Sequence, residues 1–225
     1  MKRRKFLTNT STLLLGSLAL PKILTANNFS LTQTRNESFS INMLTDKTTE
    51  AIELVDRFLK NSNLNLGKVT FEEIQLVGTH VSDIAFVRNG KLIDFRKDKN
   101  ILTNELNKIS NQLEFPQKVV NPKLVKFYNQ SPKPEFVDIF SSGILVDKIA
   151  LNEDLNSRVF KNQKGEVEFL IKNGKAQITE ATCKHKTCLK MGKINKSGES
   201  LVCIPNQISI AISGTRSGLT DSVTF

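Results

Sequence analysis

Three cysteines and a histidine lie close together in the last quarter of this 225-residue sequence. They are Cys183, His185 and Cys188, followed by Cys203. Three thiols allow one disulfide and one free thiol, in three possible pairings. Thiolate sulfur and imidazole nitrogen are also ligands that copper and zinc take in proteins. A structural disulfide is therefore the first interpretation, and a metal or redox site at these four residues is the alternative.

The spacing of the cysteines favours Cys203 as one partner of the disulfide. A bridge that closes a longer loop constrains the unfolded chain more, and for a loop of this order it stabilises the fold by about 3 kcal/mol. Cys188 lies in a predicted turn that can bend toward the strand holding Cys203. We therefore expect a bridge between Cys188 and Cys203, with Cys183 as the alternative partner.

Other patterns of catalytic residues are incomplete or missing. Cys183 and His185 match the first half of a Rieske iron–sulfur ligand pattern, but Asn206 occupies the position of the second histidine. The other histidine, His80, lies between predicted strands and is expected to be a turn residue with satisfied hydrogen bonds. The sequence contains no nucleophile elbow, zincin motif or glycine-rich phosphate loop. We predict no catalytic residue and no cofactor, with copper or zinc as the alternative.

The first 26 residues have the layout of a signal peptide. A basic cluster precedes a short apolar run, and small residues follow. Arg3 and Arg4, followed by Phe6 and Leu7, resemble a twin-arginine export signal. An ordinary secretory signal or an uncleaved N-terminal anchor are the alternatives. The sequence thus predicts export by the twin-arginine machinery to a periplasmic or extracytoplasmic location, where disulfides can form.

Composition shifts along the chain predict several segments. We expect these to be a signal peptide over 1–26, a flexible lead-in over 27–42, an α+β domain over 43–128, a linker over 129–135, a β domain over 136–214 and a tail over 215–225. In the α+β domain, apolar spacing predicts one helix with its N-cap at Thr45 or Asp46 and a second that carries Leu102, Leu106, Ile109 and Leu113. About four strands accompany them, two joined at Asn89 and Gly90.

The second half of the chain has the pattern of an all-β domain. Strand-like runs recur at short spacing from residue 137 to residue 212. Asn173 and Gly174 lie between two of these runs, and this dipeptide favours a tight hairpin because both turn positions take positive φ. The predicted fold class is therefore an α+β unit followed by an all-β sandwich or barrel-like module.

Charge excludes one class of partner. The chain has 32 basic and 22 acidic residues. Five of the basic residues lie in residues 1–26, which hold no acidic residue. The remaining excess of positive charge is small and spread along the chain, without the focused basic stripe of a nucleic-acid-binding surface. We expect no nucleic-acid partner.

Several motifs in the second half are similar to a known family. They are the run Gly165–Ile178, the segment Cys183-Lys184-His185-Lys186-Thr187-Cys188 and the run Gly198–Asn206, which ends Val-Cys-Ile-Pro-Asn. Together, over about residues 138–213, they resemble the NusG domain-II-like family. Lys184 stands where proline is common in that family, and Lys193 where tryptophan is common.

The resemblance implies a β-sandwich or barrel-like module. It also implies a setting, because exported members of the family occur beside flavin-transfer and membrane electron-transfer systems. We therefore expect a non-catalytic envelope accessory or interaction protein that works with a redox or cofactor-dependent membrane system through an envelope or membrane partner. The alternative is a periplasmic redox or metal-binding protein that uses the cysteines.

Overall fold

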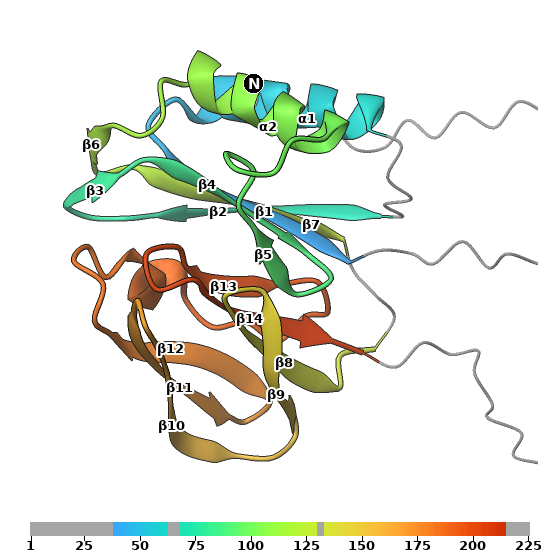
Figure 1. The fold of residues 1–225 in the computed structure, drawn as a ribbon, viewed down its shortest axis with the longest axis vertical. Coiled ribbons are helices and arrows are strands. Elements are labelled where there is room, and N and C mark those ends of the chain that lie inside the picture. Colours follow the sequence, from blue (N-terminus) through green and yellow to red (C-terminus); the bar gives the residue numbers. More distant parts are fainter. Residues whose placement is uncertain (1–37, 63–67, 130–132, 215–225) are drawn as a thin grey trace, which may run out of the picture. The chain divides into compact units, whose positions relative to one another are not determined.

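The computed structural model describes residues 38–62, 68–129 and 133–214, which lie in one compact unit. In this part of the chain an α+β unit precedes a β-rich module, and the predicted fold class is confirmed (Figure 1). The signal peptide, including Arg3, Arg4, Phe6 and Leu7, and the tail over 215–225 lie outside the described residues. No helix among the described residues is long and apolar enough to cross a membrane.

The α+β unit is an antiparallel sheet of five strands with helices on one face (Figure 1). Its strand order is β2-β7-β1-β4-β5. The elements are β1 (Phe39–Thr45), α1 (Thr48–Asn61), β2 (Val69–Gln75), β4 (Asp83–Arg88), β5 (Lys91–Ile93), α2 (Ile101–Gln112) and β7 (Lys123–Asn129). Two short strands, β3 (Thr79–Val81) and β6 (Lys118–Val120), pair separately. Side chains of both helices pack against β1, β4 and β7 in one apolar core.

Strand β1 corrects the expectation of a flexible lead-in as far as residue 42. It begins at Phe39, and all seven of its residues are buried. Phe39, Ile41 and Met43 belong to the core beneath the helices. Ser40 and Asn42 alternate with them and hydrogen-bond to Ser200 of the β-rich module. Apolar and polar residues thus alternate over Phe39–Met43 as they do in a strand, and the polar composition of residues 27–42 as a whole concealed this short pattern.

The first helix begins later than predicted. Helix α1 begins at Thr48, and its N-cap is Lys47 without a side-chain cap, so the predicted cap at Thr45 or Asp46 is wrong. Thr45 instead ends β1. The second predicted helix is confirmed as α2, which begins at Ile101 after a capping box between Asn100 and Thr103.

The β-rich module contains a four-stranded and a three-stranded antiparallel sheet. The first has the order β13-β14-β8-β9, and the second β10-β11-β12. Their strands are β8 (Phe136–Ser141), β9 (Ile144–Ala150), β10 (Leu155–Asn162), β11 (Gly165–Lys172), β12 (Lys175–Ala181), β13 (Ser200–Cys203) and β14 (Ile208–Ser213). Side chains of both sheets form one core, which Leu44, Leu76 and Leu124 of the α+β unit also join.

Both predicted Asn-Gly hairpins are confirmed. Asn89 and Gly90, with φ of 51° and 80°, join β4 to β5. Asn173 and Gly174, with φ of 53° and 65°, join β11 to β12. In each case two consecutive positive φ values give the turn a twist that matches the flanking strands.

Candidate functional site

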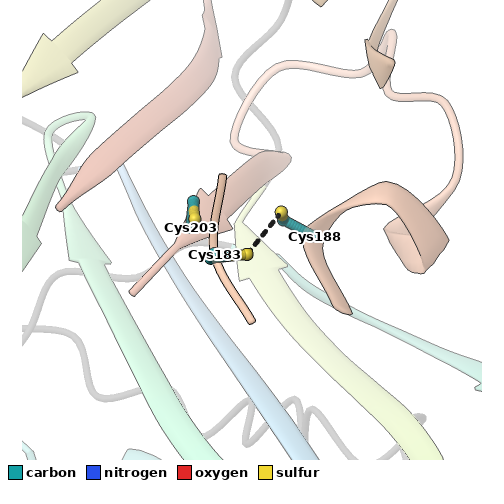
Figure 2. Close-up of side chains that lie close together, drawn as sticks. All are labelled: Cys183, Cys188 and Cys203. Atoms are coloured by element: carbon teal, nitrogen blue, oxygen red, sulfur yellow. Dashed lines mark hydrogen bonds between the residues drawn. The ribbon is translucent and has the colours of Figure 1, made fainter. Parts of the chain in front are cut away.

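The three cysteines come from three different segments of the chain and meet in the interior (Figure 2). Cys183 follows β12, Cys188 lies in the 3₁₀ helix η1 (Thr187–Met191), and Cys203 is the last residue of β13. Lys186 takes a left-handed conformation, with φ of 49°, and turns the chain between Cys183 and Cys188. All three side chains are buried, and their sulfur atoms lie within 4.8 Å of one another.

The thiols share hydrogen bonds and have unequal acidities. The thiol of Cys188 donates to Cys203 and, with help from the Asn206 backbone N–H and against the effect of burial, lowers the pKa of Cys203 to about 6. The same hydrogen bond, together with burial, raises the pKa of Cys188. Burial and the neighbouring charge of Cys203 raise the pKa of Cys183. These hydrogen bonds make Cys203 the thiol of the three that loses its proton most readily.

The sulfur atoms are close without being bonded. All three cysteines are free thiols, and the Sγ atoms of Cys183 and Cys188 are 3.8 Å apart (Figure 2). A disulfide bond is about 2.05 Å long, so any pair must move closer before it can join. The bridge between Cys188 and Cys203 therefore stays a prediction.

The two histidines lie near the cysteines in different environments. His185 is exposed; it lines the cavity beside the cysteines but is not in the sulfur cluster. His80 is buried in strand β3, and not in a turn as predicted, although its hydrogen bonds are satisfied. Its Nε2 lies 3.1 Å from the Val77 carbonyl, and its Nδ1 lies 3.3 Å from the Thr187 hydroxyl, next to Cys188. The Lys190 ammonium also lies 3.4 Å from Nε2 and donates to the same Val77 carbonyl at 3.0 Å, so the imidazole is enclosed by polar groups.

A cavity of about 200 Å³ adjoins the sulfur cluster. One wall is the face of the α+β sheet, and the other is the segment that carries the cysteines. The α+β unit contributes Asn42, Leu44, Val81, Asp83, Ala85 and Leu124; the module contributes Cys183, His185, Thr187, Cys188, Met191, Val202, Cys203, Ile204 and Pro205. Most of these side chains are apolar, so the thiols face a poorly hydrated space.

Buried polar contacts hold the sheet against the cysteine segment. Lys126 of β7 is 3% exposed, and its Nζ donates to the Met191 carbonyl at 3.1 Å. Burial lowers the pKa of this lysine. The Ser200 hydroxyl lies 2.6 Å from that of Ser40 and accepts from the Asn42 amide at 3.2 Å. These contacts connect residues far apart in the sequence, which explains why sequence reasoning did not include Lys126 or Met191 in the site.

A comparison with known families matches the part of the chain that contains the β-rich module. Residues 117–216 match the family described as NusG domain II. The match begins before residue 138, where the resemblance in the sequence begins, and it includes β6 and β7. No curated protein matches the sequence.

Solved structures resemble part of the chain. A DUF1312 family protein from Ruminococcus gnavus is 26% identical, with a TM-score of 0.32, over 36% of this chain and 99% of its own. The Lin0431 protein from Listeria innocua is 20% identical, with a TM-score of 0.35, over 37% of this chain and 100% of its own. A DUF1312 family protein from Enterococcus faecalis is 14% identical, with a TM-score of 0.34, over 36% of this chain and 98% of its own.

Proposed function

We propose that this protein binds one Cu(I) ion through Cys183, Cys188 and Cys203, as an exported accessory protein of the cell envelope. The observation that carries the proposal is the convergence of three buried sulfur atoms within 4.8 Å of one another. A buried thiolate must be paired with a charge or coordinate a metal, and a metal ion bound by all three sulfurs would meet this need.

The spacing of the sulfur atoms suits a metal. Sulfur ligands about 2.3 Å from a closed-shell ion lie about 4 Å apart when three of them surround it in a plane. The Sγ atoms of Cys183 and Cys188 are 3.8 Å apart. An ion can therefore enter with small side-chain movements, whereas a disulfide requires one of these sulfurs to move much farther.

The set of ligands favours copper over zinc. Structural zinc is almost always held by four cysteine, histidine or carboxylate ligands. Among the described residues the cluster consists of three cysteines, with no histidine or carboxylate. Soft sulfur ligands in an apolar cavity suit Cu(I), which is stable with three ligands.

The proposed setting is outside the cytoplasmic membrane, beside an envelope or membrane partner of a redox or cofactor-dependent system. Arg3, Arg4, Phe6 and Leu7 support export by the twin-arginine machinery, which carries folded proteins and so allows a metal to be loaded beforehand. Edge strand β9 supports a partner, since it carries exposed Ile144, Leu145 and Val146. Cell fractionation tests this setting: the protein should accompany the envelope and stay in the cytoplasm once Arg3 and Arg4 are lysines. Equal distribution of both forms would contradict it.

Competition for Cu(I) with a coloured chelator tests the metal site. The reduced full-length protein should withdraw one equivalent of Cu(I) from the chelator, and Cys203→Ser should remove most of this binding because it deletes one of three ligands. His185→Ala is the matched control, since His185 borders the cavity outside the cluster, and it should bind as the original protein does. Failure of the reduced protein to compete, or equal binding by Cys203→Ser, would refute the proposal.

A further inference from the structure

A fourth sulfur atom lies on the same helix as Cys188. In a 3₁₀ helix, side chains three residues apart lie on one side, and Cys188 and Met191 have this spacing in η1. Met191 is 4% exposed and lines the same cavity as the three cysteines. The helix therefore presents a thiol and a thioether toward one space.

Two hydrogen bonds fix the position of Met191. Its Sδ accepts the backbone N–H of Val202 at 3.3 Å, next to Cys203 in β13. Its carbonyl accepts from the buried Lys126 ammonium at 3.1 Å. The first bond uses one lone pair of the thioether and leaves the other free. A methionine that only filled space would keep its usual flexibility, whereas this one is held at both its backbone and its sulfur.

We infer that the Met191 thioether is a further ligand of the metal bound by the three cysteines and that it makes the site selective for Cu(I) over Zn(II). This inference rests on the proposed metal site. Thioether sulfur is a soft, uncharged ligand that binds Cu(I) well and Zn(II) poorly. Adding it to the three cysteine sulfurs gives a donor set composed only of sulfur.

The sequence supplies a matched control for this ligand. It contains three methionines, of which Met1 lies outside the described residues and Met43 is fully buried in the core beneath the helices. Met191→Leu and Met43→Leu make the same chemical change in two buried places. We expect Met191→Leu to lower the affinity for Cu(I) by about tenfold or more, as losses in a metal site typically do. Met43→Leu should leave it unchanged, and neither should alter the affinity for Zn(II).

Methyl labelling gives a direct readout of the same contact. In full-length protein with ¹³C-labelled methionine methyl groups, Cu(I) should shift the Met191 resonance and leave that of Met43 in place. Thermal unfolding of each variant verifies that it is folded.

Three outcomes would overturn the inference. In the first, the protein binds Cu(I) tightly, but the Met191 resonance does not move and Met191→Leu keeps its affinity. This outcome would exclude Met191 as a ligand and would leave the three-cysteine site unaffected. An equal loss of Cu(I) and Zn(II) affinity in Met191→Leu would give Met191 a structural role without selectivity. Absence of Cu(I) binding in the original protein would refute the metal site as well.

Discussion

The phenol of Tyr128 lies between a carboxylate and an ammonium group. Its hydroxyl donates to the Glu72 carboxylate at 2.7 Å, and the Lys196 ammonium lies 3.3 Å from the phenol oxygen. Burial and the hydrogen bond to Glu72 raise the pKa of Tyr128 to about 12, because both favour the neutral phenol. Lys196 also donates to Glu72 at 2.6 Å, so the group connects β2 and β7 with the loop before β13.

This raised pKa predicts how stability depends on alkaline pH. The folded state binds the phenol proton more tightly than the unfolded state, whose phenol has a pKa near 10. The stabilisation is therefore complete below pH ~10 and disappears as the pH rises from ~10 toward ~12. Tyr128 is the only tyrosine and the chain has no tryptophan, so tyrosinate absorbance reports this one group.

Absorbance titration of the folded protein should give a midpoint well above that of free tyrosine. Glu72→Gln should lower the midpoint, because the neutral amide no longer opposes ionisation of the phenol. A midpoint near pH ~10 in the folded original protein, at the ordinary tyrosine value, would contradict this account of Tyr128.

Individual elements differ in how well the sequence predicts them. The Asn-Gly hairpins were predicted because the dipeptide itself determines the turn. Strand β7 was missed, since six of its seven residues are buried and Lys126 interrupts the apolar pattern. The clustering of the cysteines follows from their nearness in sequence. Their cover by the α+β sheet does not, because it depends on contacts such as Ser40 with Ser200 that no local pattern encodes.

The loop before β13 meets strand β7 at Gly198, which gives a prediction at the scale of elements. A Cβ at Gly198 would lie 1.9 Å from the Asn129 carbonyl oxygen, and its φ is +90°. Gly174 has a φ of +65° and open space around its Cβ position. Gly174→Ala should therefore lower the free energy of unfolding by about 1 kcal/mol from backbone strain alone.

Gly198→Ala should lower the free energy of unfolding by about 1–3 kcal/mol more than Gly174→Ala does, because the rigid backbone of Asn129 must move. Urea unfolding of the two variants beside the original protein measures both values. Equal costs for the two substitutions would show that the loop does not contact β7 as the structure describes.

Across the whole molecule, the α+β unit supplies one wall of the cavity beside the cysteines. Leu44 and Leu124 of its sheet line this cavity and join the core of the β-rich module. Lys126 reaches across to the carbonyl of Met191. Leu44 precedes the family match, which begins at residue 117, so part of the chain outside the match lines the cavity beside the sulfur atoms with apolar side chains. Such a cover limits access of water and oxidants to thiolates.

The metal content of the protein isolated anaerobically from its own cells tests the central claim most directly. The account predicts one copper per chain and three cysteines that resist alkylation until a chelator removes the copper, after which all three react. The opposite result is protein without copper, in which only one cysteine is alkylated under denaturing conditions without reductant. Such protein would contain the disulfide instead and would contradict the claim.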